Sequence, residues 1–361
     1  MGSYTFKCGS KRTMNKKMNI GKCGKKFSSL VIDAPHDKIE IPLFVARGKK
    51  DGPTIVLLGG EHGTELTGPE IIRRFIENLD LEEVSGTIIG LPIVNVPAVR
   101  TKQHSFPYDK WVWWNDLNNL NRAWPGNPEG NIAECITHKI FNDFILKSDA
   151  VISFHSTNFA HYSEADISSK ESRKLCIDFG RIHQIRFANV SSKTSFKAPI
   201  LHGIPAVLVE LAPLREINHK VIPEGITGLE NILISMKMKK GAIRRIKDQF
   251  IIDLTKQKQI QYISSVEDGV LVREKPWGAY LKKGDIIGRI YDLYKYREIQ
   301  KLVSPAEGIL FSTGPFPSHQ STFFMHTDSV CKGECVAEIM PFDEHIVNKN
   351  GDEWEDKLYF I

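Results

Sequence analysis

The sequence predicts an α/β protein, with a mainly parallel or mixed sheet that carries helices on both faces, joined to a smaller all-β domain. From residue 54 to about 240, short apolar runs alternate with amphipathic stretches, as in strands that helices cover on both faces. From about residue 262, Gly, Pro and charged turns separate short apolar runs, which is typical of all-β structure. We therefore divide the chain into residues 1–32, 33–245 and 246–361.

Within the α/β region, four apolar runs are strand candidates and four amphipathic runs are helix candidates. We expect strands at 54–58, 87–94, 150–154 and 206–211. We expect helices at 69–79, 131–146, 170–183 and 224–238. In the first helix, apolar side chains recur at helical spacing and share one face. They are Ile71, Ile72, Phe75, Ile76 and Leu79.

The C-terminal region contains a weak internal repeat. VEDGVLV at 266–272 is followed by LKKGDIIGRI at 281–290, and SPAEGILF at 304–311 is followed by VCKGECVAEI at 330–339. Two such β units can pack as a small sandwich with approximate twofold symmetry. The repeat resembles the barrel-sandwich fold of biotinyl and lipoyl carrier domains. It lacks a lysine in their usual modified hairpin setting, so we expect a structural or lid role.

Composition and charge exclude several classes of protein. The chain is 41% hydrophobic and 25% charged, as soluble globular proteins are. It has no apolar run of about 18 residues and no apolar segment of signal-peptide type, so we expect no membrane span and a cytoplasmic location. Residues 1–32 contain eight Lys or Arg and no acid. We interpret them as a basic, flexible, solvated extension rather than an arm that binds nucleic acid or lipid.

Polar residues stand at the ends of three predicted strands. His62 and Glu65 follow the strand at 54–58, His155 follows 150–154, and Glu210 lies within 206–211. Ligands of open α/β sheets bind beyond the carboxyl ends of the strands, so these side chains can share one crevice. Two His and one Glu form a known catalytic zinc set that leaves the fourth position for water.

Each of these residues also has a simpler interpretation. His62 and Glu65 alone would usually be solvent-facing turn residues, and His155 could be a hydrogen-bonded histidine at the edge of the core. Glu210 is costly to bury among apolar neighbours, so it is either paired with a cation or a general base whose pKa burial raises. We expect Glu61 and Glu70, in the same stretch, to face solvent.

Three further polar residues are candidates for contacting a substrate. Asn121 and Arg122 stand side by side before a Pro-Gly turn, where they can clamp a carboxylate. Arg100 follows the strand at 87–94 and could polarise a carbonyl. For either arginine, a surface salt bridge is the alternative.

The segments GGEHGTELTGPE, NLNRAWPG, ISFHS and IPAVLVELA follow one another as in the succinylglutamate desuccinylase/aspartoacylase family, a branch of the zinc carboxypeptidase-like clan. The resemblance is strong over about 54–240. It implies one Zn²⁺ per chain held by His62, Glu65 and His155, with Glu210 as general base and acid. It implies that Asn121 and Arg122 bind a substrate carboxylate, and that Arg100 or Arg122 stabilises the oxyanion.

The activity implied is hydrolysis of the amide of a small N-acylated amino acid, with an N-acetyl-diaminobutyrate deacetylase branch as a neighbour. The family usually has Asp where this chain has Asn119, and Asp two residues before the third zinc ligand, where this chain has Ser153. Loss of such outer carboxylates costs roughly 10–100-fold in metal affinity or activity.

Two alternatives therefore stay open beside the deacylase. They are a carboxypeptidase acting on peptide C-termini, and a catalytically weakened homologue that serves as a binding protein. The Trp-rich segment 101–120 could be a lid, a packed loop or an oligomer contact. We expect no nucleic-acid partner, and a homo-oligomer is open.

Overall fold

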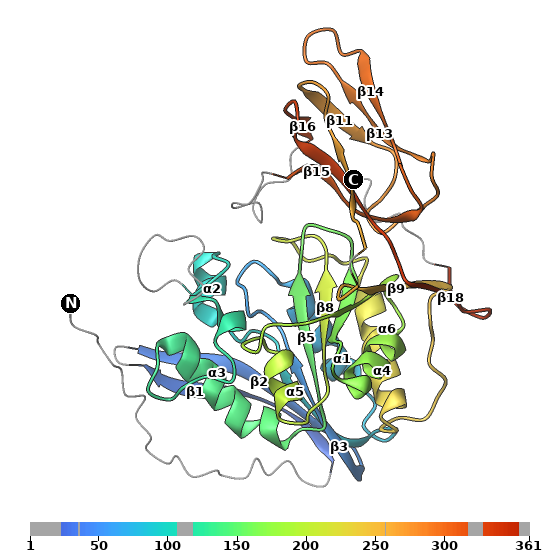
Figure 1. Cartoon of the computed structure of the whole chain (residues 1–361). Helices are drawn as coiled ribbons and strands as arrows, with labels where there is room; N and C mark the ends of the chain where they lie inside the picture. Colours follow the sequence, from blue (N-terminus) through green and yellow to red (C-terminus); the bar gives the residue numbers. More distant parts are fainter. Residues whose placement is uncertain (1–22, 35–36, 107–117, 257, 317–327, 354–361) are drawn as a thin grey trace. The chain divides into compact units, whose positions relative to one another are not determined.

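The computed structural model describes residues 23–34, 37–106, 118–256, 258–316 and 328–353 (Figure 1). The chain forms two compact units. The first contains residues 1–156, 164–181 and 189–244, and the second contains residues 157–163, 182–188 and 245–361. We keep 33–245 and 246–361 as proposed domain boundaries, with the difference that two short internal segments belong to the second unit.

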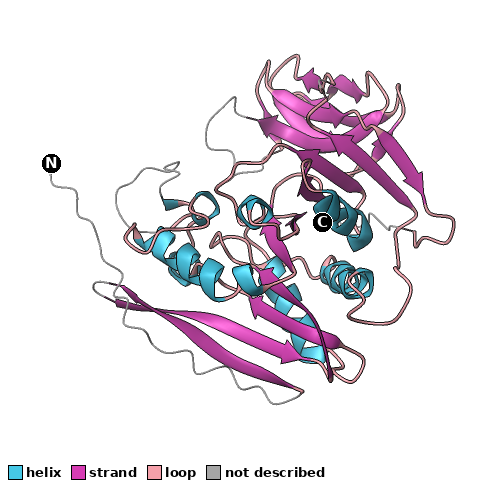
Figure 2. Ribbon diagram, turned by 60° about the horizontal axis from the view of Figure 1, so that its bottom comes forward, coloured by secondary structure: helices cyan, strands magenta, loops and turns pink. Residues whose placement is uncertain are grey.

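The first unit is built on a large mixed sheet, in which strands are neighbours in the order β1-β2-β4-β3-β5-β8. The first two strands and β4 pair antiparallel, whereas β4, β3, β5 and β8 run parallel. Their bounds are Gly24–Ala34 (β1), Asp37–Arg47 (β2), Lys50–Leu58 (β3), Ser85–Leu91 (β4), Ala150–Ser156 (β5) and Ala206–Leu211 (β8). The four predicted strands are confirmed. Residues 24–32, which we assigned to the flexible extension, instead form most of β1, one of two long paired strands seen in Figure 2.

Helices cover both faces of these parallel strands. On one face, α6 contacts both α1 and α4, and Figure 1 shows α3 and α5 in front of the other face. The helices are α1 (Thr67–Asn78), α2 (Val96–Thr101), α3 (Ile132–Asp143), α4 (Lys170–Phe179), α5 (Lys197–Leu201) and α6 (Ile222–Ser235), with short 3₁₀ turns at Leu120–Arg122 and Ile145–Lys147. The four predicted helices are confirmed. Helix α4 ends earlier than expected because Gly180 adopts the left-handed conformation that terminates helices (φ 71°).

The apolar pattern explains why α1 and α3 form where they do. The apolar face predicted for α1 is buried. Asn131 starts α3 with a reciprocal capping box, because its side chain accepts from the Glu134 backbone while the Glu134 carboxylate accepts from the Asn131 backbone. None of the helices in the described part of the chain has the length and apolar character that a membrane crossing needs.

The second unit contains two four-stranded antiparallel sheets with strand orders β10-β17-β15-β12 and β14-β13-β11-β16. Their strands are β10 (Gln261–Ser264), β11 (Gly269–Arg273), β12 (Tyr280–Leu281), β13 (Ile286–Tyr291), β14 (Glu298–Val303), β15 (Gly308–Phe316), β16 (Ser329–Val330) and β17 (Cys335–Met340). The same unit holds β7 (Gln184–Ala188), β9 (Asp248–Asp253) and β18 (Glu344–Val347), whereas β6 (Tyr162–Asp166) crosses the unit boundary.

The internal repeat explains this arrangement. Strands β11 and β13 of the first repeat pair in one sheet, and β15 and β17 of the second repeat pair in the other. Each repeat also lends a two-residue strand to the opposite sheet, because β12 pairs with β15 and β16 pairs with β11. A core of apolar side chains from both repeats, including Leu271, Ile290, Leu310 and Ile339, fills the unit. The sandwich of two related β units is therefore confirmed.

Candidate metal centre

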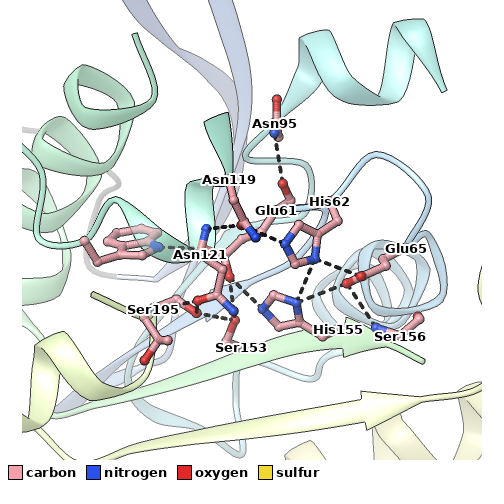
Figure 3. Close-up of polar contacts among 12 residues, drawn as sticks. Glu61, His62, Glu65, Asn95, Asn119, Asn121, Ser153, His155, Ser156 and Ser195 are labelled. Carbon is pink, nitrogen blue, oxygen red and sulfur yellow. Dashed lines mark hydrogen bonds and ion pairs between the residues drawn. The ribbon is translucent and has the colours of Figure 1, made fainter. Parts of the chain in front are cut away.

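The predicted ligands meet at the carboxyl ends of the parallel strands. His62 and Glu65 lie in the loop after β3, and His155 is near the end of β5. All three side chains are buried, with 6%, 3% and 2% of their surface exposed. Glu210 lies on β8 directly beside His155 in the strand register. Figure 3 shows His62, Glu65 and His155 pointing toward one another.

The inward-facing atoms of this cluster are close together. His62 Nδ1 lies 2.8 Å from Glu65 Oε1, and His155 Nδ1 lies 3.0 Å from Glu65 Oε2. The two Nδ1 atoms are 3.3 Å apart. Bonds of about 2.1 Å to a tetrahedral Zn²⁺ separate two ligand atoms by roughly 3.4 Å. The spacing of the two histidine nitrogens therefore fits two ligands of one ion.

The outer nitrogens of the two histidines face oxygen acceptors. His62 Nε2 lies 3.0 Å from Asn119 Oδ1, which also accepts a hydrogen bond from the Asn121 backbone N–H. His155 Nε2 lies 2.6 Å from Glu61 Oε2. Glu65 oxygens stand on the inner side, so both nitrogens of each ring face an acceptor. With a cation bound between the inner atoms, the outer acceptors would hold each imidazole proton on Nε2 and leave the Nδ1 lone pairs to the ion.

The charges of the cluster also favour a cation. Burial opposes ionisation of Glu65, but His62 and His155 outweigh it and hold the pKa of this carboxyl well below its usual value. Burial likewise disfavours a charged His155, yet Glu61 and Glu65 raise its pKa well above the ordinary range. Two buried carboxylates around two imidazoles are thus stabilised by one added positive charge, either a proton or a metal ion. The residues present fit a divalent cation.

Glu61 is placed differently from our expectation. We expected this side chain to face solvent, but it is fully buried. Its Oε1 accepts a hydrogen bond of 2.6 Å from Trp124 Nε1, and its Oε2 faces His155 Nε2 and lies 3.4 Å from Ser153 Oγ. Burial would raise the pKa of Glu61, but contact with His155 outweighs burial and lowers it. Its partners are 63 to 94 residues away in sequence, so local pattern could not reveal them.

A third histidine, His104, also lies at the site and was not predicted. Its ring stacks on His62 with centroids 3.7 Å apart, and its Nδ1 lies 3.8 Å from Glu65 Oε1. Among the described residues, ligand atoms of His62, Glu65 and His104 all lie within 4.8 Å of one another. Burial lowers the pKa of His104 to about 3, so it is a neutral imidazole. It follows α2 in an irregular segment that offers no motif by which to find it.

Two residues explain the shape of the loop between β3 and α1. A Cβ on Gly63 would lie 2.2 Å from the backbone carbon and oxygen of Ala98, so no other residue fits there. Gly63 therefore permits the close approach of α2 to the ligand loop. Asn95 caps α2 through the Ala98 backbone N–H and donates to the Glu61 carbonyl oxygen. The ligand loop and α2 are therefore held together.

Of the predicted substrate-binding residues, Asn121 and Arg122 lie near this cluster. Asn121 is buried, and its Oδ1 accepts a hydrogen bond of 2.9 Å from the Ser195 backbone N–H. Arg122 is exposed and donates to the Asn121 carbonyl oxygen, and its positive charge helps to lower the pKa of His104. Arg100 is exposed in the last turn of α2. The tryptophans of the predicted lid lie in 107–117, outside the described residues, as do residues 1–22.

Comparison with known proteins places these residues in a family. The catalytic-domain model of succinylglutamate desuccinylase/aspartoacylase matches residues 51–236. The chain belongs to this family. The match spans more than half of the chain and includes every residue of the cluster described above.

The proteins that this chain resembles include a deacetylase and a desuccinylase. The chain is 26% identical over 265 residues to the N-alpha-acetyl-L-2,4-diaminobutyric acid deacetylase of Halomonas elongata, covering 71% of this chain and 75% of that protein. Its fold resembles a succinylglutamate desuccinylase from Silicibacter sp. (TM-score 0.68, 22% identity, 89% and 96% of the two chains). It also resembles the product-bound ectoine utilization protein EutE (DoeB) from Ruegeria pomeroyi (TM-score 0.67, 22% identity, 90% and 98%).

Proposed function

We propose that this protein is a zinc-dependent amidohydrolase that removes the acyl group from a small N-acylated amino acid or related amine. The observation that carries the proposal is the convergence of His62, Glu65 and His155, each histidine with an acceptor behind its outer nitrogen. Membership of the family supports the hydrolase class. These three side chains would hold one Zn²⁺ per chain, which when bound would polarise the acyl carbonyl and acidify water.

We assign the metal to His155 rather than His104 as the third ligand. His155 stands on a central strand, and its outer nitrogen has a carboxylate partner that fixes the ring. His104 lies outside any helix or strand and stacks on His62. His104, stacked on His62, is instead assigned a contact with the bound substrate.

The remaining chemistry falls to protein side chains near the cluster. Glu210, beside His155 on β8, is assigned the role of general base that takes the proton of the attacking water and delivers it to the leaving amine. Arg100 and Arg122 are the candidates that stabilise negative charge on the carbonyl oxygen. Asn121 and Arg122 would bind the carboxylate of the amino acid, with Arg122 supplying the charge that Asn121 lacks.

The relative from Halomonas elongata supports an N-acetylated diamino acid as the first substrate to test. The departures at Asn119 and Ser153 had motivated an inactive binding protein. What supports an enzyme despite these departures is that the outer nitrogens of His62 and His155 each face an oxygen acceptor.

The test is a hydrolysis screen with zinc-loaded protein against N-acyl amino acids, N-acetyl-2,4-diaminobutyrate and short peptides. We expect release of free amine from an N-acyl amino acid, and Glu210→Gln should lower kcat by about 10²- to 10⁴-fold with zinc content unchanged. Glu171→Gln, which changes an exposed glutamate of α4, is the matched control. Release of C-terminal peptide residues alone would favour the carboxypeptidase, and absence of both zinc and hydrolysis would favour the binding protein.

A further inference from the structure

Glu61 is the one glutamate of the loop between β3 and α1 whose role the mechanism above leaves open. Its side chain is fully buried, and both carboxylate oxygens are engaged by different parts of the chain. Trp124 Nε1 donates to Oε1 at 2.6 Å, and His155 Nε2 lies 2.6 Å from Oε2. The Asn95 side chain holds the Glu61 backbone carbonyl at 2.9 Å. Both the carboxylate and the backbone of Glu61 are therefore fixed in position.

The surroundings of Glu61 require that both of its side-chain oxygens accept hydrogen bonds. The indole N–H of Trp124 can only donate, so Oε1 must accept. If an amide replaced the carboxylate, its NH₂ group would face either Trp124 Nε1 or His155 Nε2. Facing His155, it would force Nε2 to accept and would move the imidazole proton to Nδ1. That proton would occupy the nitrogen that points at Glu65 and His62, where the metal would bind.

Ser153, on β5, also lies close to the carboxylate of Glu61. Ser153 is two residues before His155 on β5, so both side chains project from the same face of the strand. Ser153 Oγ is 3.4 Å from Glu61 Oε2 and accepts a hydrogen bond from Ser195 Oγ. A carboxylate at position 153 would extend one bond beyond this hydroxyl, toward the space that Glu61 Oε2 now fills.

We propose that Glu61 is the positioning residue for His155, holding the imidazole proton on Nε2 so that Nδ1 faces the metal, from a loop rather than from β5. The inference rests on the zinc site of the proposed function. It assigns the orienting carboxylate to a residue beside His62 in sequence. One short segment, Glu61 to Glu65, then supplies two ligands and the group that orients the third.

The test compares zinc dissociation constants, measured by chelator competition, for wild type, Glu61→Gln, Ser153→Asp and the double variant. Glu61→Gln should bind zinc about 10- to 100-fold more weakly. Glu61→Gln/Ser153→Asp should return to within about threefold of wild type, since the new carboxylate restores the acceptor. Ser153→Asp alone puts two carboxylates together and should lower the thermal unfolding midpoint. Glu70→Gln, in the same stretch of sequence, should leave zinc affinity unchanged.

A second readout follows the imidazole itself. In ¹⁵N-histidine NMR spectra of zinc-loaded wild type and double variant, His155 should carry its proton on Nε2. If wild type binds zinc and Glu61→Gln binds it equally tightly, this inference is overturned and the proposed function is not. A folded double variant that binds as weakly as the single variant, or one that fails to fold, would have the same consequence, because Glu61 would then support the fold rather than the ligand. Wild type that binds no zinc would overturn the proposed function as well.

Discussion

The two sides of the ligand cluster differ in how their polar groups are held. Behind His155, the side chains of Glu61, Ser153, Ser195 and Trp124 are buried and joined by hydrogen bonds. On the other side, His104 stands in an irregular segment, and Arg122, whose charge acts on His104, is exposed. The difference shows that the buried side, behind His155, fixes the positions of the proposed ligands. There, moving one side chain leaves the hydrogen-bonding group of another unsatisfied. On the opposite side, the exposed Arg122 keeps a positive charge that is available to a proposed substrate.

The sharpest test of this contrast replaces one histidine on each side. His155→Ala removes a proposed ligand whose position is fixed from behind, so zinc affinity should fall by more than about 100-fold, beyond the range typical of outer partners. His104→Ala should change zinc affinity by less than about threefold and act mainly on KM. Isothermal titration of both variants with zinc measures the two values.

The contrast would be reversed if His104→Ala abolished zinc binding while His155→Ala kept it. The third ligand would then be His104, in line with the close spacing of His62, Glu65 and His104. Circular dichroism of both variants controls for misfolding, because His155 is more deeply buried than His104.

A smaller effect is expected at Asn119, which supports His62 from its outer nitrogen. Asn119→Ala removes the acceptor for His62 Nε2 and for the Asn121 backbone N–H, so zinc should bind roughly tenfold more weakly. Asn119→Asp keeps both acceptors and should stay within about threefold of wild type. Competition assays with a chelator measure the zinc dissociation constants. An alanine variant that binds zinc like wild type would show that His62 does not need the acceptor on Asn119.

The smallest effect concerns Glu70, which lies in the same stretch as Glu61 but away from the cluster. Hydrogen bonds from Arg73 and then Arg74 lower the pKa of Glu70 from 4.5 to about 2. A lowered carboxyl pKa contributes stability above pH 4.5 that is lost as pH falls toward about 2. Glu70→Gln should therefore cost on the order of 1 kcal/mol near neutral pH. The difference in unfolding free energy should vanish at acid pH, and a constant difference in urea titrations would contradict this origin.

These contrasts show which parts of the site local sequence could predict. The strand before His62, the strand ending at His155 and the strand carrying Glu210 are apolar runs, so burial and period alone indicate them. Parallel strands bring their carboxyl ends to one edge, and the convergence of His62, Glu65 and His155 follows from that rule. The prediction failed at Glu61, because a glutamate in a glycine-rich stretch has the sequence appearance of a solvated turn.

The sequence by itself determined four strands and four helices of the α/β region, the β sandwich built from a repeat, and the strand ends at which His62, Glu65 and His155 meet, but it did not reveal β1. It could determine those features because they depend on periodicity and on residues close along the chain. The tertiary structure decided which atoms stand behind the ligands. Glu61 is buried only because Trp124 and His155 arrive from distant elements to satisfy both of its oxygens. Such long-range pairing has no signature in a local stretch of sequence, yet it determines which nitrogen of His155 would face the proposed metal.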